Sequence, residues 1–475
     1  MSTGEATDLV ATSPTGGVVL APGRQRLIVA VLSLCGVVVA LQQTLVVPIL
    51  PDFSVALGVS PTTASWLVTA TLLTGAVATP LVGRLADLTG KRAMMLVCLT
   101  IMVAGSVVAA LGQAFPVVVA GRVLQGFAMA LLPVGVSLLR DVLPPERLGT
   151  AVALMSGTLG IGGMVGMPLA GVVYGHLGWP ALFWLSGAAG AVLAVLLLVV
   201  PESPVRARGR FDHVGAALLT VALTASLLAI SKGGQWGWAG AATVSCGVLG
   251  ILGLTAWGRF ELRTRDPLVD LRTSVLRPVL ISNVCAVLLG FAMFLSAYTA
   301  TQELQAPPET GYGPGLSEAS AGMAMMPGGL LMVILAPLSA RLTRRRGAPV
   351  TLVAGAAVIA VGYALRAVLG STVPNISASA AIISGGVALA LAAMPVLITD
   401  AAPMDQTATA NGVNSLLRSV GTSTASAVGA AVLAGSTVTV AGVTVPTLAA
   451  FTTLYWVGAA VAFAAVLVAL LPLRS

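Results

Sequence analysis

Apolar residues run along this chain in long stretches that contain no charged side chain, separated by short polar segments. A helix needs roughly 20 apolar residues to cross a bilayer. Stretches at least that long occupy 27–51, 93–121, 148–201, 278–302, 319–340, 367–399 and 419–473, and the longest hold two crossings each. The pattern therefore predicts fourteen membrane-spanning helices, near 27–50, 62–83, 93–112, 116–139, 150–173, 180–200, 214–231, 239–258, 278–303, 317–340, 348–370, 376–399, 410–434 and 447–472.

The composition agrees with this interpretation. Of the 475 residues, 57% are hydrophobic and 8% are charged, whereas a soluble domain has about 25% charged residues. The fold class is therefore an all-α membrane protein. A net charge of +8 would suggest nucleic acid as the partner of a soluble protein, but here the basic residues lie between the spans. We expect a lipid bilayer as the partner and no nucleic acid.

The basic residues fall in alternate loops. Arginines and Lys91 occupy the loops on one side, whereas the loops on the other side hold a single basic residue, Lys232. Loops rich in lysine and arginine stay in the cytoplasm, so the asymmetry places both termini there and supports an even number of spans. Residues 1–26 then form a cytoplasmic tail. We expect a multi-pass protein of a bacterial cytoplasmic membrane.

Two segments of the first half of the chain recur in the second half. The aligned pairs are 80–90 with 337–347 and 141–151 with 400–410. Each pair joins equivalent spans, which predicts two parallel six-helix repeats and two inserted linker helices. The predicted parts are bundles at 27–200 and 278–475 and a linker at 201–277. Parallel repeats of this kind build transporters whose substrate site lies between the halves, near the midplane.

Two charged side chains lie at membrane depth and suggest chemistry. Arg122 is inside the fourth predicted span, and Glu303 ends the ninth. Such residues are costly in lipid and usually face a bundle interior or a water-filled cavity. Arg122 marks a transport or proton pathway, or else is bonded to carbonyl groups of a neighbouring helix. Glu303 exchanges a proton for substrate if it faces the cavity, and otherwise touches outside water.

The segment 83–92 follows the second predicted span and reads Gly-Arg-Leu-Ala-Asp-Leu-Thr-Gly-Lys-Arg. Gly90 allows a tight turn, and Asp87 can face a helix N-terminus or the neighbouring arginines. The segment closely resembles a signature of the major facilitator superfamily. The resemblance implies that an aspartate and a following base latch the two halves together on the cytoplasmic side. It assigns this gating to Gly83, Asp87, Gly90 and Arg92.

Residues 122–126 resemble a second motif of that superfamily, R-x-x-Q-G in the fourth span. The resemblance implies a role in proton transfer for Arg122, together with Gln125 and Gly126.

The fifth predicted span is rich in glycine. Gly162, Gly166 and Ala170 fall on one helix face, where small residues let another helix approach, and Pro168 should bend the helix. With Gly171, these residues resemble the antiporter motif of exporters in the superfamily, although Met167 takes the usual proline position and Ala170 replaces a glycine. Segments 211–215, 234–238 and 266–271 resemble the fourteen-span drug:proton antiporter branch, so the resemblance covers nearly the whole chain.

The first span departs from that branch, which usually has an aspartate where this chain has Gln42. Glutamine can hydrogen-bond a substrate but cannot carry a proton or balance a cationic drug. The predicted cavity wall is therefore polar but poor in negative charge. Its predicted residues are Gln42, Gln43, Thr44, Asn283, Gln302, Asn411 and Asn414. We expect a bulky neutral or anionic amphiphile as the substrate rather than a simple quaternary cation.

These features predict a monomeric transporter that exports drugs, antibiotics or similar amphiphiles by alternating access. It would bind a small-molecule substrate and protons, use the proton gradient as its driving force and need no cofactor. A dedicated carrier for a single metabolite, including an importer, is the alternative. The two histidines lie in predicted loops and no cluster of metal ligands or nucleophiles is evident, so we do not expect an enzyme.

Overall fold

The computed structural model describes residues 11–12, 18–19, 21–46, 49, 53, 56–440 and 443–471. Most of the predicted tail at 1–26 and the last four residues lie outside this part of the chain. Fourteen helices of the described residues are long and apolar enough to cross a membrane, which confirms the fourteen-span, all-α prediction. The spanning elements are α1 (Pro22–Thr44), α4 (Trp66–Thr89), α5 (Lys91–Leu111), α6 (Phe115–Gln125) with η1 (Gly126–Ala130) and α7 (Leu131–Val142), α8 (Pro145–Leu177), α9 (Pro180–Leu197), α10 (His213–Trp236), α11 (Ala241–Glu261), α13 (Arg277–Gln305), α14 (Glu318–Arg346), α15 (Ala348–Val368), α16 (Val373–Ala401), α17 (Thr407–Gly435) and α18 (Leu448–Ala469).

Short elements connect these spans. They are α3 (Pro61–Ala64), α12 (Leu271–Ser274), η2 (Pro308–Thr310), η3 (Met404–Gln406) and the antiparallel pairs β1 (Ala11–Thr12) with β2 (Val18–Val19) and β3 (Thr437–Val440) with β4 (Val443–Pro446). Backbone groups in lipid must be hydrogen-bonded internally, so regular helices fill the membrane and irregular structure is kept to its faces.

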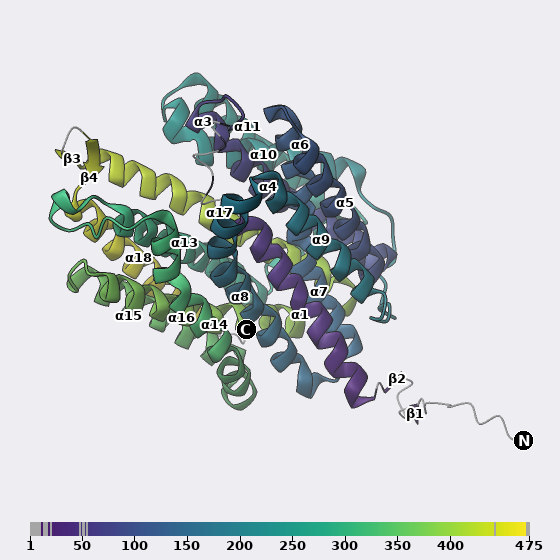
Figure 1. Ribbon diagram of the computed structural model, residues 1–475. Coiled ribbons are helices and arrows are strands. Elements are labelled where there is room, and N and C mark those ends of the chain that lie inside the picture. Colours follow the sequence, from purple (N-terminus) through teal and green to yellow (C-terminus); the bar gives the residue numbers. More distant parts are fainter. Residues whose placement is uncertain are drawn as a thin grey trace, which may run out of the picture.

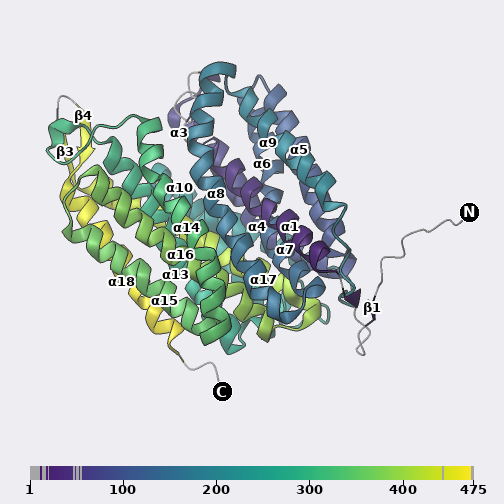
Figure 2. The same cartoon turned by 60° about the horizontal axis from the view of Figure 1, so that its bottom comes forward.

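The helices form two halves that pack in equivalent ways (Figures 1 and 2). In the first half α1 packs against α8 and α5 against α9. In the second half α13 packs against α17 and α15 against α18, the same pairs one repeat later. Helices α8 with α14, and α4 with α17, join the halves. This arrangement is consistent with the predicted parallel repeats.

We call the membrane face where α4 ends and α5, α8 and α17 begin the basic face, because the sequence places Lys91 and most arginines there. The first and last spans both meet this face, α1 by its start and α18 by its end (Figure 2). It is the face that the charge pattern predicts to be cytoplasmic. Helices α10 and α11 form a hairpin that packs on α4 and α17, beside both halves.

Several helices run further than the sequence pattern predicts, and in α4 and α10 the extension moves a residue of interest. Segment 83–89 was expected in a loop, but it forms the last turns of α4, which ends at Gly90 with a φ of +126°. Leucine and alanine favour a helix here, and the positive φ of Gly90 stops it. The aligned Gly347 also ends its helix at positive φ, +87°.

Helix α10 likewise continues past its predicted end and carries Lys232 into the protein. The Lys232 ammonium donates to the Ser65 hydroxyl at 2.8 Å and lies 4.7 Å from the centroid of the Trp66 ring. Lys232 is only 1% exposed. The single basic residue expected in a loop of the opposite face is therefore a buried contact between the linker hairpin and the first half.

The glycines of α8 serve two different neighbours. A Cβ at Gly162 would lie 2.5 Å from the Ala40 Cβ, and one at Gly166 would lie 1.8 Å from the Thr44 hydroxyl, so these glycines let α1 approach as predicted. Gly160 instead faces α14, where a Cβ would lie 2.8 Å from the carbonyl oxygen of Gly329. Gly171, which the resemblance groups with Gly162 and Gly166 as a hinge or helix-packing residue, packs against no described helix, because it is exposed and nothing lies within 4 Å of the position of its Cβ. Pro168 lies inside α8, which continues through it.

Candidate functional site

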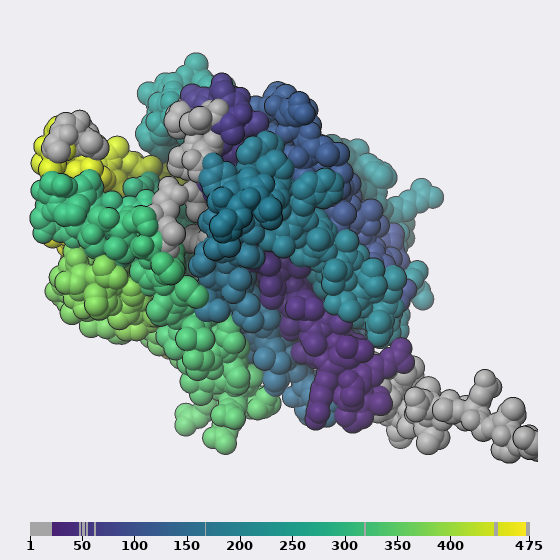
Figure 3. All heavy atoms as spheres, in the orientation of Figure 1, coloured from purple at the N-terminus to yellow at the C-terminus, as the bar shows by residue number. Residues whose placement is uncertain are grey.

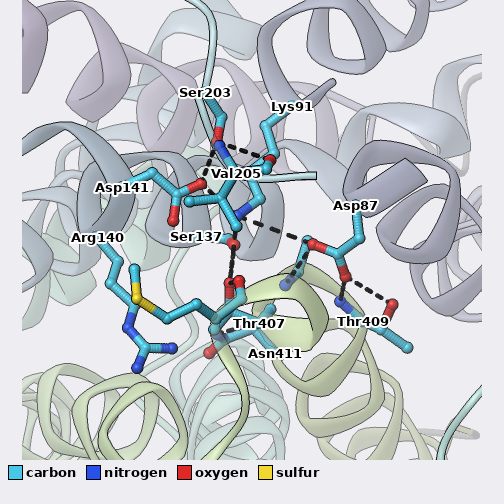
Figure 4. Close-up of polar contacts among 12 residues, drawn as sticks. Asp87, Lys91, Ser137, Arg140, Asp141, Ser203, Val205, Thr407, Thr409 and Asn411 are labelled. Carbon is cyan, nitrogen blue, oxygen red and sulfur yellow. Dashed lines mark hydrogen bonds and ion pairs between the residues drawn. The ribbon is translucent and has the colours of Figure 1, made fainter. Parts of the chain in front are cut away.

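The polar contacts between the halves gather at the basic face (Figure 4). At their centre, the carboxylate of Asp87 on α4 accepts hydrogen bonds from the first turn of α17. Asp87 Oδ1 accepts from the Ala408 amide at 3.2 Å, and Oδ2 accepts from the Thr409 amide at 2.9 Å and from its hydroxyl at 2.8 Å. The first N–H groups of a helix have no partner within the helix, and the helix dipole favours an anion there. Asp87 thus caps a helix of the opposite half.

Glycines make this contact possible. A Cβ at Gly83 would lie 2.8 Å from the Ala408 carbonyl oxygen, and one at Gly412 would lie 3.0 Å from the Thr79 carbonyl oxygen. Helices α4 and α17 therefore approach backbone to backbone, as small residues permit in membranes.

Lys91 extends the network from Asp87. It begins α5, and its ammonium lies 2.5 Å from Asp141 Oδ2, 3.8 Å from Asp87 Oδ1 and 3.3 Å from the Thr407 hydroxyl of α17. Ser137 shares a hydrogen bond with the same Thr407 hydroxyl. Lysine, two carboxylates and two hydroxyl groups thus form one buried cluster at the start of α17.

Arg92 does not take the part that the resemblance implied for it. Its guanidinium donates to the Val200 carbonyl oxygen at 2.9 Å, and its backbone N–H donates to Glu202 at 2.9 Å, both within the first half and its exit. Lys91 and Arg92 are neighbours in the first turn of α5, so their side chains point about 100° apart: that of Lys91 lies against Asp87 and Asp141, and that of Arg92 lies against the Val200 carbonyl oxygen. The base that reaches the other half is Lys91.

A second contact joins the halves at the equivalent place. In the aligned segments, Asp87 corresponds to Arg344 and Thr409 corresponds to Thr150. The Arg344 guanidinium on α14 donates to the Thr150 hydroxyl on α8, just as Thr409 donates to Asp87. The contact is repeated with the direction of donation reversed and with a cation in place of the anion.

The protein is therefore closed at the basic face. The hydrogen bonds described between the two six-helix halves lie in the part of the spans nearest this face, and the most distant joins Ser156 to the Leu391 carbonyl oxygen. Toward the opposite face the ribbons of the halves spread apart (Figure 2).

Arg122 lies inside the first half and is 1% exposed. Its guanidinium donates to the carbonyl oxygens of Leu67, at 2.8 Å, and Gln42, at 3.3 Å, and to Gln125 Oε1 at 2.8 Å. Gln125 in turn donates to Ser106 at 2.7 Å. Within the part of the chain that the structure describes, no carboxylate pairs with Arg122. Neutral oxygens alone satisfy this charge. This agrees with the interpretation that Arg122 is bonded to carbonyl groups of a neighbouring helix.

Gln42 belongs to this network rather than to an open cavity. It is 2% exposed, and its side-chain amide donates to the Gln125 carbonyl oxygen at 2.7 Å. An aspartate at this position would stand next to Arg122. Gly126, which follows Gln125, lets η1 approach α4, because a Cβ there would lie 2.8 Å from the Thr71 carbonyl oxygen.

Glu303 is fully buried inside the second half. Its carboxylate pairs with Arg366 of α15 and accepts from the hydroxyl group of Tyr455 of α18. It touches neither outside water nor the contact between the halves. The Glu303 carboxylate also acts on Tyr312, in the loop outside the membrane. Burial, and to a smaller extent repulsion by this carboxylate, raises the pKa of Tyr312 above its ordinary value.

A small cavity lies between the halves at the centre of the protein. It has a volume of about 40 Å³, room for only a few water molecules, and α7 and α8 line it on one side and α16 and α17 on the other. Asn411 and Asn414, both predicted cavity residues, line it together with Ser415 and Arg418. No Asp or Glu is among the described residues that line it.

Arg418 was missed as a site residue. It lies half-buried at this cavity and donates to the Ser415 hydroxyl at 3.0 Å. Its spacing in the sequence could have identified it. Arg418 follows Asn411 by seven residues and Asn414 by four, which places all three side chains on one face of the helix.

The other predicted cavity residues lie elsewhere. Asn283 accepts from the Asn414 amide at 3.1 Å and lines a separate groove against the linker hairpin. Thr44 donates to carbonyl oxygens of α1 and of Gly162. Gln43 is half-buried on α1, and Gln302 is exposed on α13.

Membrane-length helices in two halves, which meet around a small central cavity and close at one face, have the architecture of a membrane transporter. The sequence model of the Major Facilitator Superfamily matches residues 32–426, and the chain belongs to that superfamily. Transport rather than catalysis is the activity that this family supports.

Several relatives among characterised and uncharacterised transporters are similar to the chain. An uncharacterised MFS-type transporter of Mycobacterium tuberculosis is 28% identical over 87% of this chain and 60% of its own length. The tetracenomycin C resistance and export protein of Streptomyces glaucescens is 29% identical over 73% of this chain and 63% of its own length. The lincomycin resistance protein LmrB of Listeria monocytogenes is 26% identical over 77% of each chain. The chain thus spans less than two thirds of the length of the first two.

A solved structure has the same fold. The human organic anion transporter MFSD10 superposes with a TM-score of 0.68 over 95% of this chain and 100% of its own, at 17% sequence identity.

Replacing Asp87 by alanine is expected to open the basic face. A lost helix cap costs about 0.5–2 kcal/mol, so the open state should gain roughly 2- to 30-fold in population relative to the closed state. A single cysteine at buried Ala410, in a protein whose four native cysteines are replaced by alanine, would report this as faster labelling by a charged maleimide. Arg92→Ala is the matched control and should leave the rate nearly unchanged. Equal labelling in Asp87→Ala and the parent protein would contradict the latch.

Proposed function

We propose that this protein exports neutral or anionic amphiphiles in exchange for protons, by alternating access between its two halves. The observation that carries the proposal is the charge of the central cavity. Arg418 and the amides of Asn411 and Asn414 line it, and no carboxylate is among its described lining residues. An arginine is charged at any physiological pH, so this wall attracts anions and repels simple cations.

The relatives support export as the direction. Two of them are named for resistance to, or export of, antibiotics, one for tetracenomycin C and one for lincomycin. Close packing of α8 on α1 through Gly162 and Gly166 agrees with the exporter motif that this span resembles.

The two contacts at the basic face support alternating access. The helix cap that Asp87 provides and the hydrogen bond from Arg344 to Thr150 hold this face shut, and the cavity has room for only a few waters. Loading from the side expected to be cytoplasmic then requires both contacts to break. The cavity must widen as they do, because a substrate site of ordinary size has about 300–1,000 Å³.

Proton coupling needs a group that can change charge. Gln42 cannot supply it, and Arg122 is held by neutral oxygens. Glu303 is a buried carboxylate within a span, and a proton on it would weaken its pair with Arg366 and loosen the contact of α13 with α15 and α18. We assign the exchanged proton to Glu303, with Arg122, Gln125 and Gly126 as the motif that couples the first half.

Arg418→Gln is expected to reverse the preference for charge. A hydrogen bond to a charged group contributes about 1.5–3 kcal/mol, so kcat/KM for an anionic dye such as carboxyfluorescein should fall roughly 10- to 150-fold. Transport of ethidium, a cation, should stay the same or rise. Exposed Arg345→Gln at the basic face is the matched control and should change neither. A wild-type protein that carries ethidium well and whose anion transport ignores Arg418 would refute the charge argument.

The driving force can be tested in proteoliposomes with an imposed pH gradient. The wild type should transport faster with the gradient than without it, whereas Glu303→Gln should keep downhill exchange and lose the response to the gradient. Arg122→Ala should slow both, because it removes the centre of a buried network. If wild-type transport is indifferent to the gradient, antiport is wrong, while the charge preference and the fold stand.

A further inference from the structure

A groove of about 570 Å³ opens on the surface where α1, α8 and α14 lie side by side (Figures 1 and 3). Its volume falls within the range of about 300–1,000 Å³ that is usual for small-molecule sites. Helices α1 and α8 belong to the first half, whereas Val333 and Ala336 of α14 belong to the second. The groove therefore straddles the contact between the halves, away from the central cavity.

One end of the groove is cationic. Arg26 and Arg147 line it at the basic face, and both are exposed. Arg344, which donates to the groove residue Thr150, adds a third positive charge close by. No Asp or Glu is among the described residues that line the groove. Its open end is thus complementary to an anion.

The rest of the groove is apolar and runs toward the middle of the membrane. On α8 its lining extends from Arg147 to Ile161, which is about 21 Å along the helix axis at 1.5 Å per residue. Half of a bilayer, with its headgroup region, is about 20–22 Å thick. The groove thus has the depth of one leaflet, with charge at the headgroup level and Leu154 and Ile161 at the level of the acyl chains.

We propose that this groove binds one anionic glycerophospholipid of the leaflet at the basic face. Its phosphate lies between Arg26 and Arg147, and an acyl chain lies along α8 against Val333 of α14. Basic pockets between spanning helices are a known basis for binding anionic headgroups. Because the lipid touches both halves beside the Arg344–Thr150 contact, it favours the closed basic face seen here. This site does not depend on which compound the protein transports.

The test is native mass spectrometry of the delipidated, full-length protein titrated with phosphatidylglycerol or phosphatidylcholine. We expect one phosphatidylglycerol to bind at least tenfold more tightly than phosphatidylcholine. Each arginine near an anionic lipid surface contributes roughly fivefold, so the double variant Arg26→Gln/Arg147→Gln should lose on the order of 30-fold in phosphatidylglycerol binding and leave phosphatidylcholine unchanged. Soluble glycerol phosphate should not compete, because it has no chain to fill the groove.

Two further variants keep the test decisive. Arg259→Gln/Arg263→Gln removes two exposed arginines at the end of α11, on the same face, and should retain the preference. Ala30→Trp, an exposed groove position on α1, should weaken binding of both lipids by filling the space without changing charge. Equal binding of the two lipids by the wild type would overturn the proposal. So would a preference that survives in Arg26→Gln/Arg147→Gln, or one that is lost equally in the control pair.

Discussion

The contact on which the rest of the structure depends is the carboxylate of Asp87 at the N-terminus of α17. It supplies in one place what two groups need in lipid: partners for the free N–H groups of a helix and a compensating field for a buried anion. The backbone-to-backbone approach at Gly83 and Gly412 allows it, and Lys91 and Asp141 surround it with a buried network. A buried pair of charges gains little stability by itself, so this arrangement suits a contact that must break and form again rather than a permanent joint.

The buried charges inside the two six-helix halves are each satisfied within one half. Arg122 is bound by neutral oxygens of the first half, and Glu303 and Arg366 neutralise each other inside the second. Arg418 differs from them, because it lies at the cavity between the halves with a single hydroxyl as its described partner. A charge left without a counter-ion at the interface is free to recognise a substrate of opposite sign. Gln42 fits this view, since an aspartate there would instead pair with Arg122.

The fourteen spans could be predicted because long apolar stretches have no alternative in a bilayer. For Asp87, its chemistry allowed two partners, a helix N-terminus or the neighbouring arginines, and the structure has the first of them. Helix ends were harder, because leucine and alanine carry α4 through the segment taken for a loop, and Lys232 is drawn inward by Trp66, far away in the sequence. The positions of Arg92, Glu303 and Arg418 depend on which side of a helix meets which neighbour. Each step of one residue turns the side chain by about 100° around the helix. The neighbour that a given side chain meets therefore cannot be predicted until the packing partners of the helix are known.

Two distances measured in the same reconstituted protein test the central claim most directly. Spin labels at Glu146 and Arg345 report on the basic face, and labels at Leu177 and Leu369 report on the opposite face; all four side chains are exposed. When substrate and a pH gradient drive the transport cycle, the distance at the basic face should lengthen and the distance at the opposite face should shorten in the same molecules. Two distances that stay fixed, or that change in the same direction, would contradict halves that rock about a central cavity and are latched by Asp87.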